Sequence, residues 1–418
     1  MTDIETALDE IRDRGLYRRL RMISGPQGPR VLLDGRPVLV LCSNNYLGLA
    51  DHPRVREAAA DAAMRYGAGA GASRLISGNM RIHRRLEERL ADFERYERAL
   101  LFGSGYLANT GVIAALARRG EVVFSDELNH ASIVDGCRLA GADTFVYDHG
   151  DVEHLAWGLR EAEGRGSLIV TDGIFSMDGH VAPLAEIVEL ARRHDARVMV
   201  DEAHATGTFG PGGRGAVAAA GLEDEVDVLV GTLGKALGSY GAYVCCDGLM
   251  AKYLVNSART LIYSTALGPP QVAAAMAALD LLREEPRRVE RLQRNARVVR
   301  EALADEGLAA GGAETPIVPL VIGAADDAMA ACERALEQGV FAQGIRPPTV
   351  PEGSSRLRLT VMASHTKSEL RDAAKVVANA IPAAARKAAV QRALATESAA
   401  AGAEAAGSGV YDRLADAA

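Results

Sequence analysis

Residues 168–204 read LIVTDGIFSMDGHVAPLAEIVELARRHDARVMVDEAH, and their pattern indicates the fold class. Two short β-branched runs, at 168–171 and 197–200, enclose a longer segment whose apolar residues follow helical spacing. Comparable runs recur between about residues 37 and 246, at 37–41, 121–124, 144–147 and 226–230. A strand–helix–strand pattern repeated in this way predicts an α/β fold with a mostly parallel central sheet flanked by helices.

The chain divides into four predicted segments. Residues 1–45 form an N-terminal helix and arm, residues 46–285 a large α/β domain, and residues 286–382 a smaller α+β domain. The smaller domain is predicted from strand-like runs at 317–322 and 356–361, beyond a long helical stretch at about 269–308. The Ala-rich tail, residues 383–418, is expected to be either a frayed helix or disordered, and no function is assigned to it.

Composition narrows the class of protein. The formal net charge of the 418 residues is −8, which argues against a general nucleic-acid surface. The five cysteines are scattered without a CxxC pair, as expected for reduced thiols in the cytoplasm. The N-terminus is a charged amphipathic pattern, and no uncharged apolar stretch reaches the ~18 residues needed to cross a bilayer. The histidines show no HExxH or similar spacing, so no metal is expected.

A glycine turn is the first candidate for chemistry. GSGYLA (103–108) follows the apolar run 99–102, and Asp126 lies about twenty residues further on. This pattern matches a dinucleotide fingerprint, so a nicotinamide-dependent dehydrogenase is one alternative. A simple tight turn is another. More generally, a glycine turn that opens a helix offers free backbone N–H groups to any phosphate.

Four further candidate residues stand just after predicted strands, where ligands bind in sheets of this kind. Asp201 is a carboxylate that is costly to bury unless it faces a cation, such as a protonated ring nitrogen, although it could instead cap a helix. Lys235, in GTLGKALG (231–238), is either a solvated loop lysine or a desolvated amine able to form a Schiff base. His204 and His130 reach the same edge, although a lone histidine is more often structural.

Two arginines alternate in the run 356–359, so Arg356 and Arg358 point to one face of their strand. A guanidinium fork suits a substrate carboxylate, while a solvated strand face is the simpler explanation for either residue alone. Taken together, a phosphate turn, a buried acid, a histidine and an amine-bearing lysine are what pyridoxal phosphate requires. The dehydrogenase alternative would leave Asp201, His204 and Lys235 unused.

Over about residues 8–380 the chain resembles the α-oxoamine synthases, pyridoxal-phosphate enzymes of the type I aminotransferase fold. The resemblance is carried by eight ordered motifs: SNNYLGLA (43–50), SRLISGNMRIHRRLE (73–87), GSGYLAN (103–109), DELNHASIVDG (126–136), TDGIFSMDG (171–179), DEAHATGTFG (201–210), GTLGKALG (231–238) and RPPTVPEGSSRLRLT (346–360).

The resemblance implies a role for individual residues. Lys235 would bind the cofactor covalently, Asp201 would pair with the pyridine nitrogen, His204 would contact the ring hydroxyl and His130 would stack on the ring. Further cofactor contacts are implied for Gly105, Tyr106, Ser176, Thr232, Ser264 and Thr265. The last two match positions near a partner subunit's cofactor, which implies a homodimer with its active site at the interface. Substrate contacts are implied for Arg18, Asn45, Thr349 and Arg358, of which Arg358 would hold the amino-acid carboxylate.

The resemblance also implies a reaction, the decarboxylating condensation of an amino acid with an acyl thioester. The segments RPPTVP (346–351) and SRLISG (73–78) favour L-alanine and pimeloyl-CoA, or a pimeloyl-carrier protein, as in biotin biosynthesis. The alternative is glycine C-acetyltransferase activity on glycine and acetyl-CoA, because that group shares SNNYLGLA and the NHASI segment.

Overall fold

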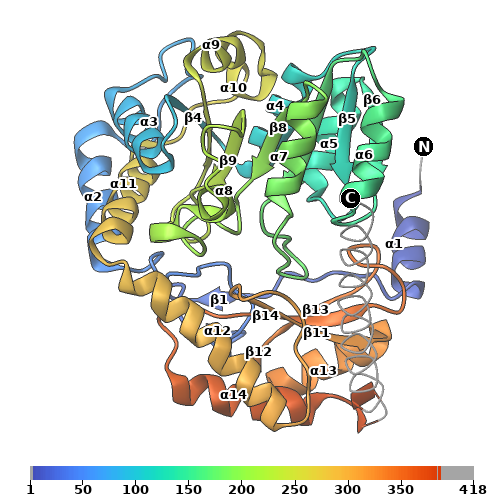
Figure 1. Ribbon diagram of the computed structural model, residues 1–418. Helices are drawn as coiled ribbons and strands as arrows, with labels where there is room; N and C mark the ends of the chain where they lie inside the picture. The colour runs from blue at the N-terminus through green and yellow to red at the C-terminus, as the bar shows by residue number, and fades with distance from the viewer. Residues whose placement is uncertain (1–2, 384, 387–418) are drawn as a thin grey trace, which may run out of the picture.

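A seven-stranded sheet forms the centre of the computed structural model, which describes residues 3–383 and 385–386. Its strands lie in the order β4-β10-β9-β8-β7-β5-β6 (Figure 1). Their bounds are β4 Arg98–Phe102, β5 Val122–Asp126, β6 Asp143–Tyr147, β7 Ser167–Asp172, β8 Arg197–Asp201, β9 Val228–Thr232 and β10 Ala242–Cys246. Only β10 runs against its neighbours β4 and β9, so the predicted mostly parallel sheet is confirmed.

Helices cover both faces of this sheet, and alternate strand residues divide between two apolar cores. Val170, Met199 and Val230 pack with α4 (Gly105–Leu116), α5 (Ala131–Ala140) and α9 (Gly248–Ser257). Ile169, Val200 and Leu229 pack in the larger core with α3 (Arg81–Glu94), α6 (Val152–Glu161), α7 (Leu184–Arg193) and α11 (Pro269–Glu284). Burial on both faces explains why these strands read as continuous apolar runs. The other helices of this layer are α2 Pro53–Tyr66, η1 Pro211–Gly213, α8 Gly215–Ala220 and α10 Arg259–Ile262.

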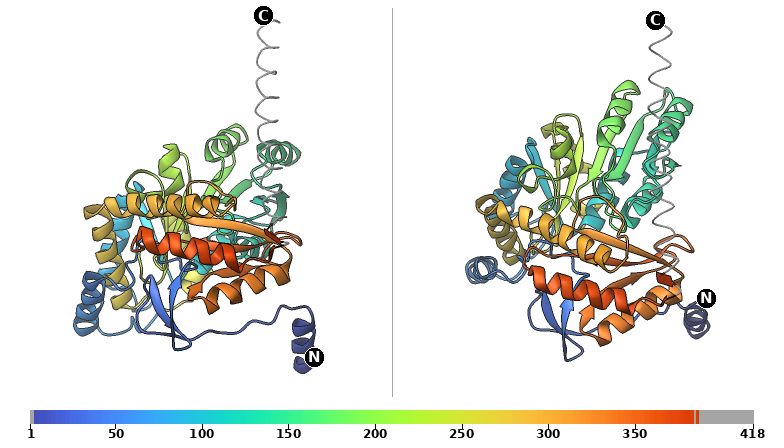
Figure 2. Two further views of the ribbon diagram at one scale, coloured as in Figure 1. Left: turned by 90° about the horizontal axis from the view of Figure 1, so that it is seen from below. Right: turned by 60° about the horizontal axis from the view of Figure 1, so that its bottom comes forward.

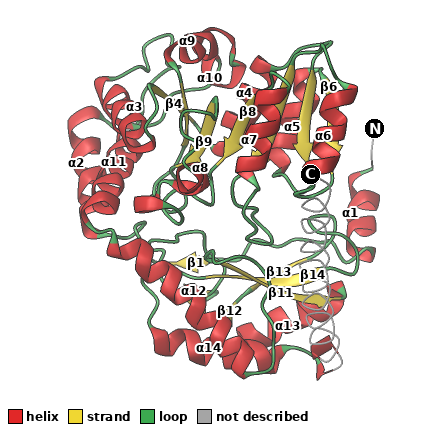
Figure 3. Cartoon of the chain, in the orientation of Figure 1, coloured by secondary structure: helices red, strands yellow, loops and turns green. Residues whose placement is uncertain are grey.

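A second layer lies below the large sheet in Figure 3. An antiparallel three-stranded sheet, β11-β14-β13, carries α12, α13 and α14. The bounds are β11 Ile317–Gly323, β13 Gln343–Ile345, β14 Ser355–Thr360, α12 Arg287–Asp305, α13 Ala325–Glu337 and α14 Lys367–Ala380. This is the α+β arrangement expected of the smaller part of the chain, while the four domain boundaries stay predictions. The predicted tail lies outside the described residues, apart from 383 and 385–386.

Two details differ from the sequence expectation. The run at 37–41 is a strand, β3 (Arg36–Val40), but it belongs to a separate sheet with β1 (Ile23–Ser24), β2 (Arg30–Leu33) and β12 (Val340–Phe341). The turn at Asp34 and Gly35, both with positive φ, folds β3 back onto β2 as a local hairpin. The long helical stretch is two helices, α11 and α12, because Pro286 lacks the N–H that α11 would need to continue.

The N-terminal helix α1 (Ile4–Asp13) stands apart from the body of the molecule (Figure 2) and buries none of its residues. Its start is set by Asp3, whose carboxylate accepts from the amides of Glu5 and Thr6. No helix in the described part of the chain combines the length and the hydropathy needed to cross a bilayer.

Candidate active site

Two carboxylates end neighbouring strands at one edge of the large sheet. Asp172 closes β7 and Asp201 closes β8, and the two are register partners, so they share one face. Both are buried. Burial and the charge of Asp201 raise the pKa of Asp172 well above its usual value, against the opposing effect of Lys235. Such a paired acidic edge needs a cation beside it.

Lys235 is that cation, three residues beyond the end of β9. Burial lowers the pKa of its amine to about 8, although the charges of Asp201 and Asp172 act in the opposite direction. Its amine makes no hydrogen bond or ion pair within the described chain. Gly238 lets the loop turn sharply here, because it has a φ of +59° and an added Cβ would lie 2.5 Å from the Ala50 nitrogen. The half-buried position of Lys235 and its lowered pKa favour a desolvated amine over the solvated-loop alternative.

The carboxylate of Asp201 is held by donors on both oxygens. Asn109 Nδ2 donates to its Oδ2 at 2.6 Å, and the Ala203 amide donates to its Oδ1 at 2.8 Å. Asn109 Nδ2 also donates to Ser132 Oγ, which lies 2.7 Å from His130 Nδ1. Asn109 was missed by sequence reasoning, although it closes the GSGYLAN motif, because its partner lies on another strand.

His130 lies at the start of α5, where its backbone amide donates to Asp172 Oδ2 at 3.0 Å. Burial lowers the pKa of its imidazole, with a smaller contribution of the same sign from Lys235 and an opposing one from Asp201. The structure therefore brings the predicted residues His130, Asp201 and Lys235 to one edge of the sheet.

His204 and Arg358 meet through a residue that sequence reasoning did not single out, Tyr46. The Tyr46 hydroxyl lies 2.7 Å from His204 Nδ1, and Arg358 Nη2 donates to the same hydroxyl at 3.4 Å. Burial, together with the charges of Lys235 and Arg358, lowers the pKa of His204 well below its usual value. His204 is thus a neutral imidazole.

The two arginines of β14 differ in their partners. Arg356 pairs with the carboxylate of Asp178. Arg358 is equally buried, but it donates only to neutral oxygens: the Ser176 carbonyl, Asn44 Oδ1 at 3.3 Å and the Tyr46 hydroxyl. Neither arginine lies on a solvated face. A buried guanidinium with no carboxylate partner in the described chain is a ready site for an anionic ligand.

Asn45 does not share this contact. Its Oδ1 accepts from the Ala50 amide at 3.2 Å, while its Nδ2 is buried without a protein partner. The neighbouring Asn44 is the one that meets Arg358. Because this amide is buried and unpaired, Asn45 can donate a hydrogen bond to a ligand.

The glycine turn has the form expected of a phosphate site. β4 ends at Phe102, and Ser104 caps α4 by accepting from the Leu107 amide at 3.2 Å. The amides of Gly105 and Tyr106, at the first two helical positions, have no acceptor within the described residues. A Cβ built on Gly105 would meet nothing within 4 Å, so the approach to these amides is open.

The remaining residues that are predicted to contact the cofactor lie on separate segments of the chain. Ser176 is buried in the loop after β7, and Thr232 Oγ1, at the end of β9, donates to the Gly241 carbonyl at 3.1 Å. Ser264 and Thr265 lie on a different segment, where Thr265 is exposed and forms an isolated bridge with Ser73. Neither residue forms a hydrogen bond with His130, His204 or Lys235 in the described structure.

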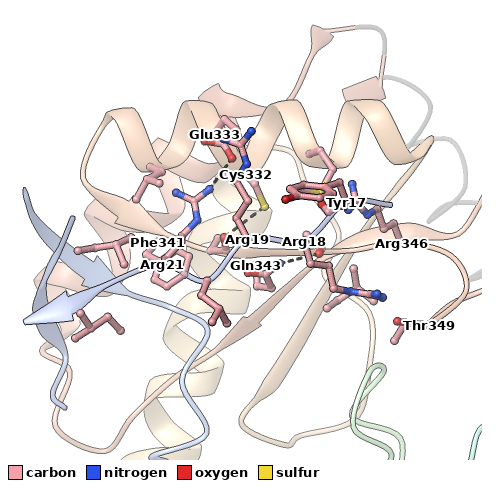
Figure 4. A pocket seen from close by; sticks show the side chains of 18 residues that line it. Tyr17, Arg18, Arg19, Arg21, Cys332, Glu333, Phe341, Gln343, Arg346 and Thr349 are labelled. Carbon is pink, nitrogen blue, oxygen red and sulfur yellow. Dashed lines mark hydrogen bonds and ion pairs between the residues drawn. The ribbon is translucent and has the colours of Figure 1, made fainter. Parts of the chain in front are cut away.

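Arg18 and Thr349 line a separate cavity of about 570 Å³ between the N-terminal arm and α13 (Figure 4). Its wall is mixed: the apolar side chains of Leu33, Leu336 and Phe341 lie beside Glu333 and four arginines, Arg18, Arg19, Arg21 and Arg346. Of these, Arg21 pairs with Glu333 at 2.6 Å, while Arg18 and Arg19 have no carboxylate partner in the described chain. Arg358 and Asn45 are not among the residues that line this cavity.

Asp126, which the dehydrogenase alternative required for a ribose, is occupied by protein donors. Its buried carboxylate accepts from the amides of Leu128 and Gly150, both at 2.9 Å, and contacts His149 Nδ1 at 3.0 Å. The Asp126 carboxylate therefore holds the loops after β5 and β6 and not the glycine turn.

Comparison with known proteins agrees with this geometry. The family model for aminotransferase class I and II matches residues 36–377. An 8-amino-7-oxononanoate synthase from Citrifermentans bemidjiense is 52% identical, over 88% of this chain and 96% of its own. A second, from Lysinibacillus sphaericus, is 47% identical over 87% and 94%.

Solved structures give the same result. A serine palmitoyltransferase from S. paucimobilis with bound PLP–myriocin aldimine superposes with a TM-score of 0.85 and 31% identity, over 90% of this chain and 96% of that one. An 8-amino-7-oxononanoate synthase from Francisella tularensis has a TM-score of 0.72 and 27% identity, over 82% and 97%. The chain therefore belongs to the class I and II aminotransferase family, and within it to the α-oxoamine synthases.

Proposed function

We propose that this protein condenses L-alanine with a pimeloyl thioester, carried by CoA or a carrier protein, to give 8-amino-7-oxononanoate, the free thiol and CO2. The observation that carries the proposal is the unpartnered, desolvated amine of Lys235 beside Asp172 and Asp201. Relatives named 8-amino-7-oxononanoate synthase that share about half of the sequence support the choice of substrates.

The residues present fit pyridoxal phosphate, since each of its polar groups finds a complementary group. The open amides of Gly105 and Tyr106 would hold the phosphate. Asp201, fixed by Asn109, would face the pyridine nitrogen, and neutral His204 the ring hydroxyl. Lys235 would be the covalent anchor, with His130 against the ring and Ser176 and Thr232 as further contacts. When bound, the cofactor supplies an electron-accepting ring that stabilises negative charge at the α-carbon of an amino acid.

The side chains around that position then bind the amino acid and move its proton. Arg358 would hold the carboxylate, because its guanidinium is buried without a counter-charge. The Lys235 amine has a pKa lowered to about 8, so near neutral pH a useful fraction can accept a proton from the α-carbon and later return it. Asn45 Nδ2, buried and unpaired, is available as an additional donor.

The cavity lined by Arg18 and Thr349 supports a dicarboxylate-derived acyl chain over an acetyl group. The apolar part of its wall matches methylene groups, and Arg18 has no carboxylate partner among the described residues. A chain that ends in a carboxylate would satisfy both features. An acetyl group is too short to contact both the apolar part of the wall and Arg18, so the glycine C-acetyltransferase alternative does not account for this cavity.

We further propose that the protein is a homodimer with its active site at the subunit interface. Ser264 and the exposed Thr265 would then approach the partner's cofactor, which is consistent with the exposure of Thr265. A cytoplasmic location also belongs to the proposal, on the scattered unpaired cysteines.

The test is a substrate matrix. L-Alanine, glycine and L-serine would each be paired with pimeloyl, acetyl and palmitoyl thioesters, and release of thiol and CO2 followed. Preference for alanine with a pimeloyl thioester supports the proposal. Preference for glycine with acetyl-CoA would replace it with the acetyltransferase, and turnover of NADH without a cofactor chromophore would return the dehydrogenase.

A further inference from the structure

A pair of histidines lies outside the residues assigned above, next to the loop that follows β7. His149 Nδ1 contacts Asp126 Oδ1 at 3.0 Å, and His149 Nε2 lies 3.0 Å from His180 Nδ1. The two imidazoles are nearly parallel, with an interplanar angle of 16°. Asp126 is itself fixed by the amides of Leu128 and Gly150, so His149 is anchored at the end of β5.

His180 belongs to a tight hairpin, residues 173–182. The Phe175 amide donates to the His180 carbonyl at 2.9 Å, and Ile174 and Val181 form a bridge. The ring of Phe175 meets His149 edge-on, with 4.4 Å between the ring centroids. His149 therefore contacts the hairpin at two points, one polar and one aromatic.

The other side of the hairpin holds the arginines of β14. Its Asp178 pairs with Arg356, and its Ser176 carbonyl accepts from Arg358 Nε. The hairpin is thus a bridge between the edge of the large sheet and Arg358. Displacing it would remove a hydrogen bond that orients the Arg358 guanidinium.

We infer that His149 and His180 are positioning residues that clamp the 173–182 hairpin and, through it, orient Arg358 toward the carboxylate of the amino acid. The inference rests on the proposed role of Arg358. It assigns a purpose to an imidazole pair that the condensation chemistry does not otherwise use.

The clamp accepts one proton but not two. When neither or only one of the two imidazoles is protonated to imidazolium, one of the facing nitrogens donates and the other accepts. When both are imidazolium, both facing nitrogens are donors and repel. Burial opposes charge on His149, but Asp126, Asp178 and Glu127 outweigh it and raise its pKa. Burial, His149 and Arg356 lower the pKa of His180, against Asp178 and Asp126. The second proton therefore binds with a lowered pKa, and we expect the clamp to open as the pH falls.

The experiment compares His180→Ala, His180→Asn and a control, His194→Ala, in the full chain. An asparagine amide offers both a donor and an acceptor near the Nδ1 position and does not titrate. Hydrogen–deuterium exchange of residues 173–182 reports the clamp, and the KM values for amino acid and acyl donor report Arg358.

We expect His180→Ala to speed exchange of the hairpin and raise the amino-acid KM by about 2- to 10-fold, with the acyl-donor KM unchanged. His180→Asn should restore both values and abolish the rise in amino-acid KM that we expect of the wild type at acidic pH. The inference is overturned if His180→Ala matches His194→Ala in exchange, if the hairpin loosens without a change in amino-acid KM, or if His180→Asn keeps the wild-type pH profile. Exchange does not depend on the identity of the substrates, so it separates failure of the clamp from failure of the proposed function.

Discussion

Asn109 Nδ2 donates to Asp201 Oδ2 across 2.6 Å, so a side chain of the phosphate-turn helix orients the carboxylate at the end of β8. The glycine turn and the acidic strand end are therefore parts of one site. Removing this donor should leave Asp201 in place but misdirected, because the Ala203 amide still holds its other oxygen.

Asn109→Ala should lower kcat by about 10- to 100-fold, the usual effect of losing a hydrogen bond to a charged group. Steady-state kinetics and a cofactor titration would measure it, with thermal melts to verify folding. The matched control is Asn256→Ala, at an exposed position of α9, which should change neither kcat nor cofactor binding. Equal kcat values in the two variants would contradict the role of Asn109.

Lys235→Ala should abolish turnover while the chain still binds the cofactor non-covalently. The phosphate turn, Asp201 and His204 do not involve the lysine, so most of the binding surface remains. Equilibrium dialysis would measure binding and thiol release would measure turnover, beside Lys252→Ala as an exposed control. A Lys235→Ala chain with undiminished rate would refute the catalytic assignment.

Arg358→Gln should raise the KM for the amino acid by about 100-fold or more and leave the KM for the acyl donor nearly unchanged. The lost contact is a charge-assisted pair in a buried setting, the strong kind of hydrogen bond. Arg36→Ala, at the exposed start of β3, is the control. A shift confined to the acyl-donor KM would show that Arg358 binds the other substrate.

Arg18→Ala should raise the KM for the acyl donor and not that for the amino acid, the reverse of Arg358→Gln. Because Arg18 lines the cavity with Thr349 and has no carboxylate partner in the described part of the chain, its loss should raise the KM for pimeloyl-CoA about tenfold or more and spare that for L-alanine. Any residual activity with acetyl-CoA should not change. Arg14→Ala, beyond the end of α1, provides the comparison. Equal effects on pimeloyl and acetyl donors would exclude recognition of a distal carboxylate.

Glu94 should make the chain less stable at alkaline pH. Its side chain is fully buried, and this burial raises its pKa from 4.5 to about 8. The hydrogen bond that Tyr243 donates to it acts in the opposite direction. A carboxyl whose folded pKa exceeds its unfolded value stabilises the fold below pH 4.5, and this stability is lost as the pH rises toward 8.

Glu94→Gln, which cannot ionise, should therefore lose less stability than the wild type between pH 5 and pH 9, by on the order of a few kcal/mol. Urea unfolding at several pH values would measure the difference. Parallel pH dependence in the two proteins would show that Glu94 does not titrate in this range.

The chemistry of the site could be predicted from sequence where it follows strand order. Asp201, His130 and Lys235 each come after an apolar run, and the parallel sheet necessarily brings such residues to one edge. Asp172 follows the run 168–171 in the same way, so this rule also reaches it, although it was not singled out. Tyr46 and Asn109 could not be found in this way, because their roles arise from partners on other elements. Asn44 and Asn45 show the limit most clearly, since adjacent residues of one type point to different partners.

The fold shows the same division. Periodicity identified the strands, but it did not separate β3 from the large sheet, because a strand's own sequence does not state which sheet it joins. The alternation of Arg356 and Arg358 placed both on one face. Only the Asp178 carboxylate, from the hairpin after β7, distinguishes the satisfied arginine from the one available to a ligand.

The central claim is that the amine of residue 235 binds the cofactor aldehyde covalently. Borohydride reduction of the purified, cofactor-loaded protein, followed by peptide mass spectrometry, tests it directly. We expect a pyridoxyl-phosphate adduct on the peptide that contains Lys235 and none on the peptide that contains Lys252. An unmodified Lys235 peptide after reduction, or an adduct at another lysine, would contradict it.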